Sequence, residues 1–277
     1  MPEIRNISFN EEAHTYTDDG LLVYTSVTTK IKQVERPFDR EYWLGVKAKE
    51  RGISIEQLGN EWDEINKLSC IRGNNIHKKL EDSVNSIYKP SELPIYKTSF
   101  GSDIGTLANK KGIANLDELA NSELRYISID IYNYLTQLII RGWTLYPELR
   151  VYLSEYRIAG TIDLPAIRDN EVIIIDWKTN KDELSFKSGY YKKEWRGGMK
   201  VKTDIWIDKK EYFLSPLSHL EYCKGNVYGL QLSMYGKIMQ YWGFKVRGLV
   251  LYHIRDNTVK HYNIQYMEYE ADKVIKL

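Results

Sequence analysis

The chain has 277 residues, of which 43% are hydrophobic and 28% are charged, and its formal net charge is +1. This composition is typical of a folded globular protein and argues against wholesale disorder, collagen and a coiled coil. The two cysteines, Cys70 and Cys223, can form neither a disulfide framework nor a four-thiolate iron-sulfur site. We therefore expect a protein of a reducing, cytoplasmic compartment, with neither a secretion signal nor a membrane span.

The first half of the chain is predicted to be mostly helical. Alternation of apolar and polar residues over 7–24 around Asp18-Asp19-Gly20 predicts a small β-hairpin, and Ser26 is a suitable N-cap for the helix that follows. Apolar residues at helical spacing predict further helices at 37–51, 54–68, 74–87 and 122–141. The last of these should end at Gly142, and residues 88–115, rich in Ser, Gly and Pro, should form a connection.

The second half of the chain is predicted to be rich in strands. These are expected at residues 144–153, 157–164, 171–177, 245–254 and 258–266. The run Val172-Ile173-Ile174-Ile175 is typical of a strand buried on both faces, and Asn226 is a candidate N-cap for a helix reaching about residue 242. The pattern predicts an α+β fold, with a central mixed β-sheet flanked by helices and a mostly helical N-terminal part.

We expect two parts in the chain. Residues 1–121 would hold the hairpin and the helices, and residues 122–277 would form the core, with an insertion at about 180–225 that is rich in basic and aromatic residues.

Asp163, Asp176 and Lys178 are the residues most suggestive of chemistry. Asp163 and Asp176 are expected at the ends of neighbouring strands, and Asp176 and Lys178 project from the same face of one strand because they are two positions apart. Paired carboxylates suit Mg²⁺ or Mn²⁺, and a lysine beside them could offset the charge that develops at phosphorus. The alternative is an ordinary surface ion pair between Asp176 and Lys178.

Three motifs occur in an order that favours the first interpretation. They are Gly160-x-x-Asp163, then Asp176-x-Lys178-Thr179, and later Gln231-x-x-x-Tyr235. In this order they resemble the PD-(D/E)XK nuclease superfamily, and most closely its RecB-like branch. The resemblance implies a restriction-endonuclease-like core and a metal-dependent deoxyribonuclease that uses Mg²⁺ or Mn²⁺, with two ions in the site.

The resemblance also implies roles for single residues. Asp163 and Asp176 would bind the metals, with the backbone carbonyl of Trp177 completing the coordination, and Lys178 would stabilise the attacking water and the transition state. Gln231 and Tyr235, one helical turn apart, would orient the DNA strand. The alternative is that Gln231 and Tyr235 lie one turn apart on an amphipathic helix by chance and have no role in DNA binding.

Three further residues complete the candidate site. Residues 73–81 resemble the Gly-x-x-x-His-x-x-x-Glu helix of RecB-like nucleases, which makes His77 a candidate metal ligand and Glu81 a residue that supports it. Glu148 is a less certain ligand, with an exposed charge or a pair with Arg150 as the alternative. The sequence departs from the family pattern in two ways. Ile162 precedes Asp163, where the family motif has a proline. The chain also lacks the cysteines that bind an iron-sulfur cluster in some relatives, which places it with the cluster-free members.

The segment 178–210 carries ten Lys or Arg residues against five Asp or Glu residues, a local charge of +5. Cations interleaved with aromatic side chains are typical of a surface that binds single-stranded nucleic acid. The alternative is a solvated insertion whose aromatics complete the core. The candidate nucleic-acid-binding residues are Lys181, Lys192, Lys193, Trp195, Arg196, Lys200 and Lys202.

The leading hypothesis is a DNA exonuclease that acts on ends or single strands in recombination, repair or replication. The alternatives are a structure-selective endonuclease with the same site and a non-catalytic DNA-binding protein on a nuclease fold. The expected partners are DNA with free ends or single strands and a recombination or replication protein, with no membrane. A stand-alone nuclease without helicase motifs suits a phage function, and the host cytoplasm would then be its location.

Overall fold

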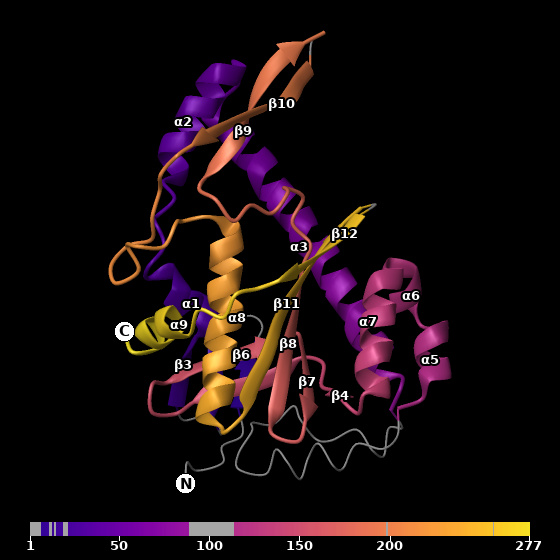
Figure 1. Ribbon diagram of the computed structural model, residues 1–277. Coiled ribbons are helices and arrows are strands. Elements are labelled where there is room, and N and C mark those ends of the chain that lie inside the picture. The colour runs from indigo at the N-terminus through magenta and orange to yellow at the C-terminus, as the bar shows by residue number, and fades with distance from the viewer. Residues whose placement is uncertain are drawn as a thin grey trace.

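Figure 1 shows the computed structural model, which describes residues 7–10, 13, 15–18, 22–88, 114–197, 199–256 and 258–277. The strands are β1 (Ile7–Asn10), β2 (Thr15–Asp18), β3 (Leu22–Ser26), β4 (Thr144–Leu145), β5 (Leu149–Leu153), β6 (Ile158–Ile162), β7 (Leu164–Arg168), β8 (Glu171–Lys178), β9 (Gly189–Arg196), β10 (Met199–Asp208), β11 (Lys245–Arg255) and β12 (Thr258–Asn263). The helices are α1 (Val27–Lys32), α2 (Arg40–Arg51), α3 (Ile55–Asn85), α5 (Leu116–Asn121), α6 (Glu123–Ile127), α7 (Ile129–Ile140), α8 (Lys224–Tyr241) and α9 (Glu268–Ile275).

A mixed β-sheet lies at the centre, in the strand order β12-β11-β8-β7-β4. β8 pairs antiparallel with β7 and parallel with β11, and α8 and α3 with α7 lie on opposite sides of this sheet (Figure 1). The predicted α+β class, with a central mixed sheet flanked by helices, is therefore confirmed. Within the described residues, no helix is both long and apolar enough to cross a membrane.

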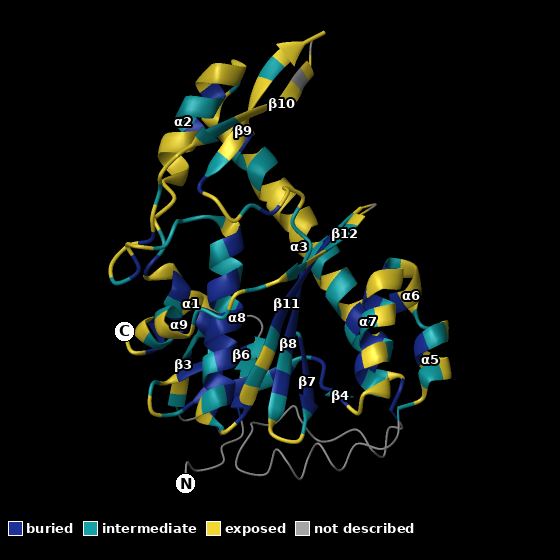
Figure 2. Ribbon diagram, viewed as in Figure 1, coloured by how far each residue is buried: buried dark blue, intermediate teal, exposed yellow. Residues whose placement is uncertain are grey.

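The two faces of β8 belong to two hydrophobic cores. Val172 and Ile174 pack with α8, whereas Ile175 and Trp177 pack with α3 and α7. Figure 2 shows the resulting burial along β8, β11 and α8. Because side chains alternate along a strand, Asp176 shares the α8 side of the sheet with Val172 and Ile174.

A second sheet has the order β1-β2-β3-β6-β5, and one bent hairpin links it to the central sheet. In this hairpin β4 pairs with β7 in the central sheet, and β5 pairs with β6 in the second sheet. The predicted strands at 144–153 and 157–164 are wrong as continuous elements, since the first divides into β4 and β5 and the second ends at Ile162 before β7 begins at Leu164. The bends fall at Glu148, whose φ is 51°, and at Asp163.

Two predictions on the N-terminal helices need correction. The predicted helices at 54–68 and 74–87 are one helix, α3, capped by Ser54. No gap divides the helix between residues 68 and 74, and Gly73 in this stretch lies close to the segment after β8, because a Cβ there would lie 3.1 Å from Oγ1 of Thr179. Ser26 caps α1 as predicted, accepting a hydrogen bond from the Thr29 N–H at 3.0 Å.

Other elements differ in their bounds or were not predicted. The helix predicted at 122–141 divides at Ser128 into α6 and α7, and α5, α9, β1, β9 and β10 were missed. α8 begins after Cys223, and the amide of Asn226, the predicted cap, donates instead to the Glu221 carbonyl at 2.8 Å. The predicted connection at 88–115 lies mostly outside the described residues, as do parts of the turns around residues 19–20 and 257.

The predicted insertion contains a two-stranded antiparallel ribbon formed by β9 and β10, which projects beyond the C-terminal end of β8 (Figure 1). The predicted division between residues 121 and 122 stays a prediction. Across that division, β3 pairs in parallel with β6 through Thr25 and Ile158.

Candidate active site

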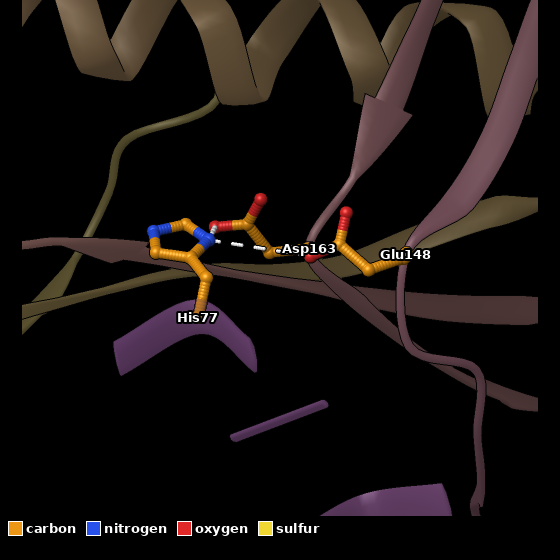
Figure 3. A group of neighbouring side chains, drawn as sticks. All are labelled: His77, Glu148 and Asp163. Atoms are coloured by element: carbon orange, nitrogen blue, oxygen red, sulfur yellow. Dashed lines mark ion pairs between the residues drawn. The ribbon is translucent and has the colours of Figure 1, made fainter. Parts of the chain in front are cut away.

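Three potential metal ligands converge where the bent hairpin meets α3. His77 comes from α3, Glu148 from the bend between β4 and β5, and Asp163 from the bend between β6 and β7 (Figure 3). Nδ1 of His77 lies 3.7 Å from Oδ2 of Asp163 and 4.0 Å from Oε1 of Glu148. One ligand atom from each of the three lies within 4.8 Å of the others, which is close enough for all three to hold one cation.

Asp163 is held in place by the next strand of the central sheet. Its Oδ2 accepts a hydrogen bond from the backbone N–H of Trp177 at 2.9 Å, and the side chain is 13% exposed. Because this N–H lies between Asp176 and Lys178 in sequence, the hydrogen bond ties the carboxylate cluster to the Asp-x-Lys segment. The predicted metal contact of the Trp177 carbonyl stays a prediction.

Asp176 and Lys178 form an ion pair that is almost closed to solvent. Oδ2 of Asp176 lies 2.6 Å from Nζ of Lys178, and the side chains are 1% and 17% exposed. No described group donates a hydrogen bond of good geometry to this oxygen, so the ion pair is its principal interaction. Asp176 is not part of the His77, Glu148 and Asp163 cluster in this arrangement, although the sequence predicts it as a metal ligand.

The surroundings shift the pKa values of this pair. Burial, with the nearby charge of Asp163, raises the pKa of Asp176 to about 6, in opposition to Lys178. Burial by itself would lower the pKa of Lys178, but the carboxylates of Asp176 and Asp163 outweigh it and raise that pKa. Lys178 is therefore held in its charged form beside the carboxylates.

Glu148 also has a shifted pKa, with burial as the main cause. Burial raises its pKa to about 8, and the charges of Asp163, Glu81 and Asp176 add to this effect. Four carboxyl groups thus crowd one region, and their mutual repulsion would be relieved by a cation. Glu81 lies near Lys78, at 3.4 Å from its Nζ, and shows no hydrogen bond to His77 among the described residues.

Gln231 and Tyr235 lie on α8, on the side of the sheet that carries Asp176. Nε2 of Gln231 lies 3.4 Å from the Tyr235 hydroxyl, and Tyr235 packs on Gly160, where a Cβ would lie 2.6 Å from the ring. Burial raises the pKa of Tyr235 well above its usual value, so the phenol stays protonated. The Gly-x-x-Asp strand and the Gln-x-x-x-Tyr helix are therefore in direct contact.

Two residues near the site were not predicted from the sequence. The centre of the Tyr228 ring lies 5.1 Å from Nζ of Lys178, which is a cation–π distance. Tyr228 could have been found from the sequence, because it lies three positions before Gln231 and therefore on the same face of the helix. Arg72 donates from Nη1 to the Thr179 carbonyl at 2.8 Å, which joins α3 to the segment after Lys178. No local pattern marks Arg72, since its partner is more than one hundred residues away in sequence.

The candidate nucleic-acid-binding residues lie apart from this cluster. Lys181 is exposed in the loop after β8, and the others belong to the β9–β10 ribbon. These others are Lys192, Lys193, Trp195, Arg196, Lys200 and Lys202, of which the Lys200 side chain lies outside the described part of the structure. The structure thus separates a partly buried carboxylate site from an exposed basic ribbon.

Comparisons with known proteins add little. No protein-family model matches the chain, and no curated protein sequence matches it. A solved structure titled "Crystal structure of SSO0001" is similar with a TM-score of 0.26 and 17% sequence identity, over 53% of this chain and 54% of that chain. The chain thus spans about half the length of that structure, and a similarity this low assigns neither family nor function.

Proposed function

We propose that this protein is a metal-dependent deoxyribonuclease of the PD-(D/E)XK type that hydrolyses phosphodiester bonds in DNA. The observation that carries the proposal is the convergence of His77, Glu148 and Asp163 next to the ion pair of Asp176 and Lys178. These groups come from segments spread over about one hundred residues of the chain. An ordinary surface ion pair between Asp176 and Lys178 would not require His77, Glu148 and Asp163 to converge beside it.

The donor set fits a hard divalent cation. Two carboxylates and one imidazole suit Mn²⁺ and also Mg²⁺, and Asp176, whose Oδ2 pairs with Nζ of Lys178 at 2.6 Å, adds a further carboxylate beside them. When bound, the cation would supply positive charge that polarises the scissile phosphate and activates water.

The residues of the chain have distinct tasks in this proposal. His77, Glu148 and Asp163 hold the cation, and the Trp177 N–H fixes the orientation of Asp163. Lys178, kept charged by Asp176, places an ammonium where negative charge develops on the phosphate oxygens. Tyr235 and Gln231 present a phenol and an amide that position the strand.

The test is cleavage of end-labelled single-stranded and double-stranded DNA in Mg²⁺, Mn²⁺ or a chelator. We expect cleavage that requires the cation and falls by at least about a hundredfold in Asp163→Asn and in Lys178→Met. Glu155→Gln, which neutralises an exposed carboxylate in the β5–β6 turn, is the control and should leave the rate unchanged. Equal rates in parent and Asp163→Asn would refute the proposed site.

Circular single-stranded DNA decides between exonuclease and endonuclease. An enzyme that requires ends must leave the circle intact, whereas a structure-selective endonuclease opens it. Binding of DNA without metal-dependent cleavage of any of these substrates would instead indicate a non-catalytic DNA-binding protein.

A further inference from the structure

The β9–β10 ribbon is an exposed arm with a fixed base. At that base the Ser188 N–H donates to Oε2 of Glu221 at 2.8 Å, and the Glu211 N–H donates to Oγ of Ser188 at 3.1 Å. Trp206 packs so tightly over Gly189 that a Cβ there would lie 2.6 Å from the indole. The ribbon therefore has a defined direction relative to the body, although most of its side chains are exposed (Figure 2).

The two faces of the ribbon differ in how their cations are paired. Side chains alternate along a strand and directly opposed residues share a face, so the register assigns each described position to one face. The first face, here called the lysine–aromatic face, carries Tyr191, Lys193, Trp195, Lys202 and Trp206, with Asp208 opposite Gly189 at its base. Beyond that base, the described paired positions of this face hold no carboxylate.

On the opposite face, the carboxylate of Glu194 pairs with the neighbouring cations. There Glu194 lies between two cations, with Oε1 at 3.2 Å from Nζ of Lys192 and Oε2 at 3.7 Å from Nη2 of Arg196. Tyr190 lies on the same face. Glu194 thus pairs with both cations of this face and leaves it a formal charge of +1.

On the lysine–aromatic face, by contrast, Lys193 and Lys202 stand directly opposite each other. Like charges in opposed positions destabilise a strand pair, and no described residue forms an ion pair with Lys193. Nζ of Lys202 lies 4.1 Å from the centre of the Tyr191 ring and 3.2 Å from Glu183. A polyanion on this face would relieve the repulsion between the two lysines.

Aromatic rings on the same face fit bases between the phosphates. Tyr191 and Trp206 meet edge to face at 5.1 Å, which holds both rings, and Trp195 is 69% exposed nearer the tip. Lysines and exposed rings on one surface match a single strand, whose unpaired bases can stack on the rings. The bases of a duplex are stacked on each other and cannot use them.

The lysine–aromatic face is connected to the candidate active site. Lys178, His253 and Lys260 are register partners across β8, β11 and β12, so about two strand spacings, roughly 10 Å, separate Lys178 from Lys260. Glu183 then bridges Lys260 at 2.5 Å and Lys202 at 3.2 Å. Ion pairs from Lys260 through Glu183 to Lys202 therefore link β12 of the central sheet to the ribbon.

We infer that the lysine–aromatic face of the β9–β10 ribbon binds single-stranded DNA and delivers it to the site of Asp163 and Lys178. This inference rests on the proposed function for the identity of the nucleic acid. On this inference, a preference for single-stranded over double-stranded DNA comes from one face of the ribbon and not from the other.

The experiment measures binding of fluorescent oligo(dT), and of a duplex of equal length, to the full chain in a chelator, where no cleavage interferes. Lys193→Glu and Trp195→Ala alter the lysine–aromatic face, whereas Lys192→Glu and Tyr190→Ala are matched changes on the opposite face. We expect the first pair to weaken oligo(dT) binding at least about tenfold and the second pair about twofold or less. Because Lys192→Glu and Lys193→Glu change the net charge equally, the comparison removes the general electrostatic effect.

Equal losses from the two faces, duplex binding as tight as oligo(dT) binding, or no binding by the parent would each overturn the inference. Circular dichroism of the four variants verifies that the fold is retained. The proposed function fails separately, since binding confined to one face without cleavage in Mg²⁺ or Mn²⁺ would leave the ribbon inference standing and refute the nuclease.

Discussion

The backbone N–H of Glu148 donates a hydrogen bond to the backbone carbonyl of Asp163 at 2.8 Å. This bond lies where both arms of the bent hairpin pass from the central sheet to the second sheet. It fixes two carboxyl groups at the same level of the fold, facing His77 on α3 (Figure 3). The candidate site therefore forms where the bent hairpin passes between the two sheets.

The pH dependence of stability is a first prediction. Without a cation, Glu148 has a pKa near 8 in the folded protein against about 4.5 when unfolded, so the folded state holds a proton that the unfolded chain releases. The free energy of unfolding should thus fall as pH rises through this window. Asp176, with its pKa raised to about 6, adds to the lower part of the fall.

Urea unfolding in a chelator at a series of pH values measures this dependence. Glu148→Gln should flatten the part of the curve between pH about 6 and about 8, while Glu155→Gln should follow the parent. Curves of identical slope for the parent and Glu148→Gln would contradict the assignment. Added Mn²⁺ should restore stability at the upper end, because it replaces the proton as the neutralising charge.

The buried pair of Asp176 and Lys178 gives a second prediction. Lys178→Met leaves a carboxylate without its cation in a buried place and should lower the free energy of unfolding by about 3 kcal/mol. Asp176→Leu combined with Lys178→Met removes both charges and should recover most of that loss, though not activity. Lys47→Met, which breaks an exposed pair with Glu50, should cost less than about 1 kcal/mol, and an equally small cost for Lys178→Met would show that the pair is solvated.

A third prediction concerns the contact between Gly160 and Tyr235. An alanine at 160 would place its Cβ 2.6 Å from the ring, so Tyr235 must move, and we expect a loss of roughly 1–3 kcal/mol in the free energy of unfolding together with slower cleavage. Gly248→Ala is the control, because a Cβ there meets Ile173 at an ordinary 3.7 Å. Equal stability of the two alanine variants would rule out a packing role for Gly160.

The sequence was most informative where one local pattern determines the structure. The β-branched run of 172–175 predicted the central strand, because such a run is typical of a strand buried on both faces, and a helix reaching about residue 242 was also predicted correctly. The bends at Glu148 and Asp163 were missed, since each is a single residue whose conformation depends on pairing with two different sheets. The two-part prediction for α3 was wrong because the helix runs unbroken from Ile55 to Asn85, although many of its middle residues are exposed and carry no regular apolar face.

In the candidate site, too, some features could be predicted from the sequence and others could not. Motif order was enough to single out Asp163, Asp176 and Lys178, and the structure brings all three to one end of the sheet. Sequence spacing could not say that Asp176 is closed off by Lys178, because that depends on how deeply β8 is buried. Arg72 has no motif and acts only through a contact formed on folding.

The last prediction tests whether Arg72 sets the position of His77. Arg72 donates to the Thr179 carbonyl at 2.8 Å and pairs with Asp256 at 2.9 Å, so it holds α3 against the ends of β8 and β11 one and a half turns before His77. Arg72→Ala should let α3 shift and should raise the Mn²⁺ concentration needed for half-maximal cleavage several-fold, with a smaller effect on the rate at saturating Mn²⁺.

Arg51→Ala is the matched control, since Arg51 pairs with Glu61 at 2.7 Å between α2 and the first half of α3, away from the cluster. It removes one arginine and one ion pair but no contact with β8, so its Mn²⁺ dependence should equal that of the parent. A general loss of stability would lower the rate at every Mn²⁺ concentration and leave the half-maximal concentration unchanged. Such a result for Arg72→Ala would show that Arg72 supports the fold without positioning His77.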